Sequence, residues 1–269
     1  MLSLAISALL GRRRSFRQDA WDLVARLTPP LQVYGRENIP EKGPCLFTFN
    51  HYFRPGFGVW WVALAISSLA PEEIHWAMAS AWTYPPGWRD RLVTPTTRWA
   101  FRRVARAYGF TNMPPMPPRP HEVAERAGAV REILAYARRA PRPLVGLAPE
   151  GGDQPGGLLN MPPAGAGRFI LHLAGLGLEI APVGAYEADG GLCLCFGPQY
   201  PLLAPGGLSA DERDLAASRI VMGHIAELLP AALRAGFSQG NTQYSSLSNV
   251  TVKPGVSTAP MNTPNPPIG

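Results

Sequence analysis

Between residues 30 and 237, short apolar segments typical of strands alternate with segments of helical periodicity. Strands separated by helices predict an α/β fold, which we expect to be a mixed sheet with helices on its faces. Binding sites in such sheets gather where strands end. The expected strands are 31–35, 44–50, 74–80, 143–150, 179–187 and 192–197, and the expected helices are 57–70, 97–107, 121–139, 165–174 and 209 to about 235.

Both ends of the chain differ from this central region. Residues 1–29 begin with the apolar stretch MLSLAISALL, and the basic run GRRRSFR follows it. In a secretory signal the positive charge precedes the apolar core, which is the reverse of this order. We interpret 1–29 as an amphipathic helical region able to lie on an anionic membrane; a helix packed on the domain is the alternative. Residues 238–269, rich in Ser, Thr, Asn, Gln and Pro, are predicted to be disordered.

The net charge of +6 comes almost entirely from arginine. This charge favours an anionic partner such as a membrane surface or a CoA-linked substrate, although a compositional bias towards arginine explains it equally well. We expect no nucleic-acid partner, because no recognition-helix, aromatic RNA-binding or zinc signature is present. No apolar run reaches the roughly 18 to 20 residues of a spanning helix. With residues 1–29 interpreted as a membrane-lying region, we expect peripheral association with the cytoplasmic side of a membrane.

The sequence contains no pattern for a metal site, a serine hydrolase or a P-loop. Cys45, Cys193 and Cys195 form neither a CxxC motif nor a zinc spacing, so we interpret them as small buried thiols in a reducing compartment. The histidines form no metal-ligand cluster, and no metal site is expected. The chain has no G-x-S-x-G elbow and no P-loop ending in Gly-Lys-Ser/Thr. A serine hydrolase and a nucleotide-binding protein of that type are therefore disfavoured.

Two expected strand ends carry residues suited to chemistry. The segment CLFTFNH leads into Asn50 and His51, and VGLAPEGG leads into Glu150. Each residue is weak evidence alone, because a histidine after a strand is commonly an ordinary polar residue and a glutamate in a turn an ordinary loop acid. Their interpretation depends on the order and surroundings of the two segments.

Four segments in the same order resemble the phospholipid/glycerol acyltransferase family, of the lysophosphatidate acyltransferase type. VYGRENIPEKGPCLFTFNHY is similar to the opening of that family, and VGLAPEGG stands where the family has Phe-Pro-Glu-Gly-Thr-Arg. GAGRFILHLAGLGLEIAPVGAY is similar to its glycine-led helix and following strand, and FGPQYPL to a later strand end. The resemblance covers about residues 30–202. It implies a glycerolipid acyltransferase-like fold and a role in phospholipid or glycerolipid metabolism.

The resemblance also implies a reaction and a set of site residues. His51 would act as general base on the hydroxyl of a glycerolipid or another lipid alcohol, and Glu150 is the acid of the second catalytic block. The acyl donor would be acyl-CoA or acyl carrier protein, and no cofactor is expected. Gly151 and Gly152 would let backbone amides approach an anionic oxygen. Asn50 is assigned to substrate binding with these glycines.

The chain also departs from the family pattern in the histidine loop. The position where the family has an orienting aspartate is Gly56, and no acidic residue lies between Glu41 and Glu72. Glu150 or Asp153 can take over that role if the two strand ends lie side by side.

The phosphate-binding arginine of the second block is also missing, and Asp153 stands in that region instead. Arg54 in the histidine loop is a candidate substitute cation, so Arg54 and Asp153 join the expected substrate-binding residues. A second hypothesis follows from these losses: a catalytically impaired relative that binds lipid or acyl groups.

Overall fold

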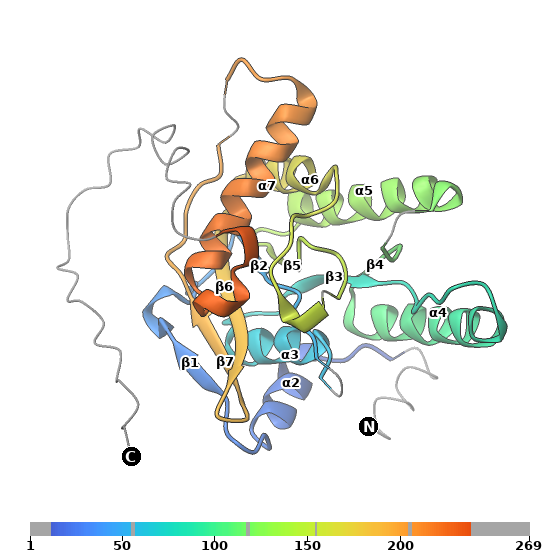
Figure 1. Cartoon of the computed structure of the whole chain (residues 1–269), viewed down its shortest axis with the longest axis horizontal. Helices are drawn as coiled ribbons and strands as arrows, with labels where there is room; N and C mark the ends of the chain where they lie inside the picture. Colours follow the sequence, from blue (N-terminus) through green and yellow to red (C-terminus); the bar gives the residue numbers. More distant parts are fainter. Residues whose placement is uncertain (1–11, 55–56, 117–118, 154, 204–205, 238–269) are drawn as a thin grey trace.

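The computed structural model describes residues 12–54, 57–116, 119–153, 155–203 and 206–237. These residues form a mixed sheet flanked by helices, which confirms the expected fold class (Figure 1). The sheet has seven strands in the order β1-β7-β6-β2-β5-β3-β4. The strands are β1 (Gln32–Tyr34), β2 (Cys45–Phe49), β3 (His75–Ala79), β4 (Thr111–Met113), β5 (Leu144–Leu147), β6 (Glu179–Ala188) and β7 (Gly191–Phe196).

Strand direction places the ends of the central strands together. β2 pairs in parallel with β5 on one side and with β6 on the other, whereas β6 and β7 form an antiparallel pair. Thr48 of β2 is opposite Leu147 of β5 in this register. The residues that follow β2 and β5 therefore emerge side by side at one edge of the sheet.

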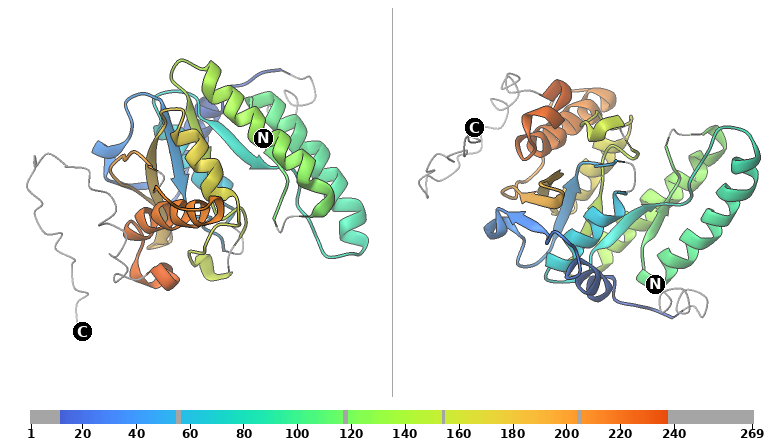
Figure 2. Two further views of the ribbon diagram at one scale, coloured as in Figure 1. Left: turned by 90° about the horizontal axis from the view of Figure 1, so that it is seen from above. Right: turned by 60° about the horizontal axis from the view of Figure 1, so that its bottom comes forward.

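Helices cover both faces of the sheet (Figures 1 and 2). Strand β2 contributes Phe47 and Phe49 to the core on the α3 side and Leu46 to the core on the α7 side. A strand buried on both faces reads as a continuous apolar run, which CLFTF is. The helices are α2 (Phe16–Val24), α3 (Trp60–Leu69), α4 (Trp88–Tyr108), α5 (Val123–Arg139), α6 (Ala166–Ala174) and α7 (Ala210–Glu227), with short 3-10 turns η1 (Arg36–Asn38), η2 (Pro120–Glu122), η3 (Pro155–Gly157), η4 (Ala231–Leu233) and η5 (Ala235–Phe237).

Three element boundaries differ from the sequence-based expectation in ways that matter for the argument. Helix α4 begins at Trp88 rather than near residue 97, and it continues through Pro95, which normally interrupts a helix. Strand β5 ends at Leu147, so Glu150 lies in the turn beyond the strand. Helix α7 ends at Glu227 rather than near 235, because Pro230 follows it.

The described part of the N-terminal region packs on the domain. Ser15 caps α2, and α2 lies against α3. The side chain of Arg17 donates a hydrogen bond to the carbonyl of Ala70 at 2.7 Å, and Arg14 pairs with Asp19. This arrangement corresponds to the alternative of a packed helix for residues 12–29. The interpretation of residues 1–11 as part of a membrane-lying helix, and that of 238–269 as disordered, concern segments outside the described residues.

No helix in the described part of the chain combines the length and the apolar character needed to cross a membrane.

Candidate active site

Asn50 fixes the end of β2 against its neighbour β6. The side chain is 1% exposed. Its Nδ2 donates to the carbonyl of Ala185 at 2.8 Å, and its Oδ1 accepts from the amide of Ala185 at 2.7 Å. Both ends of the Asn50 amide are therefore used by backbone. This geometry fits an anchor for the residue that follows rather than the substrate contact that we expected from the sequence.

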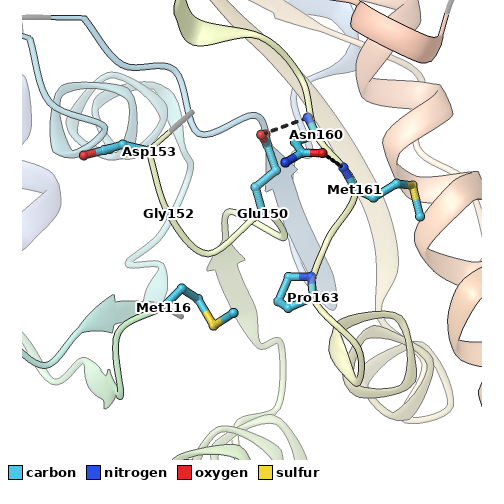
Figure 3. Close-up of a pocket in the computed structure, with 7 residues that line it drawn as sticks. All are labelled: Met116, Glu150, Gly152, Asp153, Asn160, Met161 and Pro163. Carbon is cyan, nitrogen blue, oxygen red and sulfur yellow. Dashed lines mark hydrogen bonds between the residues drawn. The ribbon is translucent and has the colours of Figure 1, made fainter. Parts of the chain in front are cut away.

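Glu150 braces the turn after β5 against two other segments. Its Oε1 accepts from the backbone amide of His51 at 2.9 Å, and its Oε2 accepts from the backbone amide of Asn160 at 3.2 Å (Figure 3 shows the second bond). The side chain is 5% exposed, and this burial raises the pKa of the carboxyl to about 7, against the opposing effect of the two backbone N–H groups and His51. The recorded hydrogen bonds of Glu150 thus hold the His51 backbone, not its ring.

Asp153 is the carboxylate that approaches the His51 ring. Its Oδ1 lies 3.1 Å from Nδ1 of His51, so the two strand ends do lie side by side as the sequence reasoning required. The approach is within ion-pair distance but too oblique for a hydrogen bond, and Nδ1 has no hydrogen-bond partner within the described parts of the chain. The side chain of His51 is 14% exposed and that of Asp153 is 52% exposed. Gly56, where the family has its own acid, lies outside the described residues.

Arg54 is held by an acidic residue of β6. Its guanidinium pairs with the carboxylate of Glu187 through two nitrogens, one of them at 2.7 Å, and the hydroxyl of Tyr52 donates to the same carboxylate at 3.1 Å. The Arg54 guanidinium is the main reason why the pKa of Glu187 lies below its usual value. Glu187 therefore neutralises the cation that we expected to replace a lost phosphate-binding arginine.

The glycines after Glu150 shape the turn. Gly151 has φ of 72°, a backbone conformation that favours glycine, and its amide donates to the carbonyl of Ala148 at 3.1 Å. That N–H is thus part of the turn rather than a donor for an anionic oxygen, contrary to the sequence-based expectation. Gly152 lines the neighbouring pocket instead.

A pocket of about 360 Å³ opens beside Glu150. In Figure 3, Glu150 stands between Met116, Gly152 and Asp153 on one side and Asn160, Met161 and Pro163 on the other. The sequence reasoning missed Met116, Asn160, Met161 and Pro163. The two methionines stand in proline-rich segments, PPMPP and NMPP, which mark non-helical loops but do not indicate which loops meet.

No protein-family model matches this chain, and no curated protein matches it in sequence. Among solved structures, the chain is similar to the crystal structure of the 1-acyl-sn-glycerophosphate (LPA) acyltransferase PlsC from Thermotoga maritima. The two chains are 14% identical and superpose with a TM-score of 0.46, over 79% of this chain and 77% of that chain.

Proposed function

We propose that this chain is a membrane-associated O-acyltransferase in which His51 is the general base and Asp153 is its orienting acid. The observation that carries the proposal is the 3.1 Å approach of the Asp153 carboxylate to Nδ1 of His51. Two buried polar groups, Asn50 and Glu150, fix the backbone on either side of that approach. In His-based acyl transfer the acid hydrogen-bonds to Nδ1–H of the base, and a small turn of the His51 ring or of the half-exposed Asp153 side chain would make that bond here.

The ring nitrogen of His51 that faces Asp153 decides which nitrogen can take a proton from the acceptor. With Nδ1 beside Asp153, Nε2 is left to take the proton of an acceptor hydroxyl. The hydroxyl oxygen then forms a bond to the carbonyl carbon of an acyl thioester, and the carbon–sulfur bond breaks. The departing thiolate receives the proton from His51, so the base is regenerated. Asp153 stabilises the imidazolium that exists between the two proton transfers. Acyl-CoA or acyl carrier protein supplies the thioester, and the step needs no cofactor.

The charges around the pocket favour an uncharged acceptor. Two acidic residues, Glu150 and Asp153, line the pocket, and the guanidinium of Arg54 is already paired with the carboxylate of Glu187. A phosphate next to Asp153 would be repelled by that carboxylate. Met116 and Met161 offer flexible apolar surface that adapts to different lipid shapes. We therefore propose a lipid alcohol or a glycolipid hydroxyl, rather than a phosphate-bearing lysolipid, as the acceptor.

Acyl transfer from a panel of acyl-CoA and acyl-carrier-protein donors to neutral and phosphate-bearing acceptors tests this proposal. His51→Ala should lower kcat/KM by about a hundredfold to ten-thousandfold, the range for loss of a general base. Asp153→Asn should lower it by about tenfold to a hundredfold and alter its pH profile, since this acid is half exposed and water screens it. Asp189→Asn is the matched control, in the β6–β7 turn with φ of 51°, which asparagine tolerates. Undiminished turnover by His51→Ala would refute the role of His51.

A second candidate function is lipid or acyl binding without turnover. It is favoured by the oblique contact between His51 and Asp153 and by the exposure of the acid. If this is the function, acyl-chain ligands should raise the midpoint of thermal unfolding, and no donor in the panel should be turned over. Turnover of any donor by the unmodified chain excludes it.

A further inference from the structure

Helix α4 presents large apolar side chains to solvent. Trp88, Leu92 and Trp99 are 65%, 64% and 53% exposed. Their spacing of four and seven residues places them on one face of the helix. The fully buried positions of α4 are the small residues Thr94, Ala105 and Ala107, and these three large apolar side chains are exposed instead. Figure 2 shows that α4 runs along the outer edge of the molecule.

Trp82 is a further exposed aromatic residue, on the opposite side of the helix. It is 56% exposed, and its ring packs edge-on against Phe101 of α4, with ring centroids 5.4 Å apart. The backbone amide of Trp82 also donates to the hydroxyl of Thr97 at 3.2 Å. The loop before α4 is thus fastened to the helix. We call Trp88, Leu92 and Trp99 together the α4 face.

Arginines surround the α4 face. Helix α4 has six arginines and a single acidic residue, Asp90, which accepts a hydrogen bond from the hydroxyl of Thr94 at 3.0 Å. The guanidinium of Arg89 lies 5.5 Å from the ring centroid of Trp88, and that of Arg103 lies 4.6 Å from the ring centroid of Trp99. Cation–π contact keeps these charges beside the aromatic rings. Exposed tryptophans and cations therefore share one surface.

Two further arginines of α4 contact the neighbouring helix. Arg98 lies 3.7 Å from Glu122 just before α5, and Arg102 lies 3.7 Å from Glu125 of α5. These ion pairs join the inner flank of α4 to α5.

We propose that the α4 face docks this protein onto an anionic phospholipid bilayer. Tryptophan favours the boundary between headgroups and acyl chains, because its ring is largely apolar while its N–H stays hydrogen-bonded. The flanking arginines match the phosphates of anionic lipids. Single-stranded nucleic acid also stacks on tryptophan, but its binding sites are positively charged grooves. The α4 face is carried by one helix at the edge of the molecule, which suits a flat surface.

Vesicle sedimentation with the full chain tests this proposal. The unmodified protein should bind vesicles that contain phosphatidylglycerol more tightly than pure phosphatidylcholine vesicles. Trp88→Ser with Trp99→Ser should weaken that binding by at least about tenfold, because two large apolar side chains no longer insert. Tyr34→Ser with Leu215→Ser is the matched control, since both residues are exposed apolar positions on other elements, and it should bind like the unmodified protein.

A charge-reversal variant tests the role of the arginines. Arg89→Glu with Arg91→Glu should weaken binding to phosphatidylglycerol vesicles by about tenfold or more, and should change binding to phosphatidylcholine little. Acidic residues stabilise the first turn of a helix, so circular dichroism should show α4 intact.

Three outcomes would overturn the proposal. The first is vesicle binding that the Trp88/Trp99 variant retains in full. The second is equal affinity for neutral and anionic vesicles. The third is binding of a single-stranded oligonucleotide, lost in the same variant, without vesicle binding. The measurement requires no acyl transfer, so loss of the proposed enzyme activity and loss of membrane docking remain distinguishable.

Discussion

Glu150 should make the unfolding free energy of this protein decrease as pH rises. The residue is 5% exposed, and burial raises the pKa of its carboxyl from 4.5 to about 7. Between those pH values the native state holds a proton that the unfolded chain has released. The stability that Glu150 contributes is therefore fully present below about pH 4.5, and it is lost as pH rises through about 7.

The size of this decrease follows from the pKa. One pH unit of pKa displacement corresponds to about 1.4 kcal/mol, so a rise from 4.5 to about 7 corresponds to about 3 kcal/mol. Glu150→Gln keeps the shape of the side chain but cannot ionise. The difference in unfolding free energy between the unmodified protein and this variant should change by about 3 kcal/mol between pH 4.5 and 7.5, in favour of the variant at high pH.

Urea unfolding followed by far-UV circular dichroism, repeated across this pH range, measures that difference. Taking the difference removes the titration of every group that the two proteins share. Glu132→Gln on the exposed surface of α5 is the matched control, and its difference from the unmodified protein should stay nearly constant. A Glu150→Gln difference that varies by less than about 0.5 kcal/mol over the range would refute the reasoning.

Two other substitutions test the structure around the site. Asn50→Ala should lower the unfolding free energy by about 2–4 kcal/mol in urea unfolding, because it leaves the N–H and C=O of Ala185 without partners. Asn112→Ala is the control. The amide nitrogen of Asn112 has no partner among the described residues, so this variant should cost less than about 1 kcal/mol. Gly146→Ala should destabilise by about 1–3 kcal/mol in thermal unfolding, since its Cβ would lie 2.2 Å from the ring of Trp76; an unchanged midpoint would contradict that packing.

Hydrophobic patterning predicted most of the sheet, because buried parallel strands are short apolar runs that stand out between polar loops. Strand β4 was missed, since Thr111–Met113 is short and leads into proline-rich sequence. The start of α4 was missed for a different reason. Pro95 and the exposed tryptophans contradict the pattern of an ordinary amphipathic helix, which our reading assumed.

The candidate site was predictable in part. Adjacent parallel strands bring their ends together, so the meeting of His51 with a carboxylate after β5 followed from the fold class. Which carboxylate reaches the ring depended on the path of the turn, and the sequence left Glu150 and Asp153 as equal candidates. The pocket residues Met116 and Asn160 come from separate loops, whose meeting is set by tertiary packing that local patterns do not record.

The arrangement of these residues couples His51, the proposed base, to Asp153, its proposed orienting acid. Glu150 and Asp153 belong to the same short segment after β5, and Glu150 holds the backbone of His51. A shift of that segment therefore moves Glu150 and Asp153 together. The ionised form of Glu150 accepts both backbone hydrogen bonds with charged oxygens, whereas in the protonated form the oxygen that carries the hydrogen is a weaker acceptor. The hydrogen bonds that Glu150 accepts from the His51 and Asn160 backbone are therefore strongest above pH 7. At that pH the buried charge lowers the unfolding free energy most. Acids whose burial opposes stability in this way are enriched at functional sites.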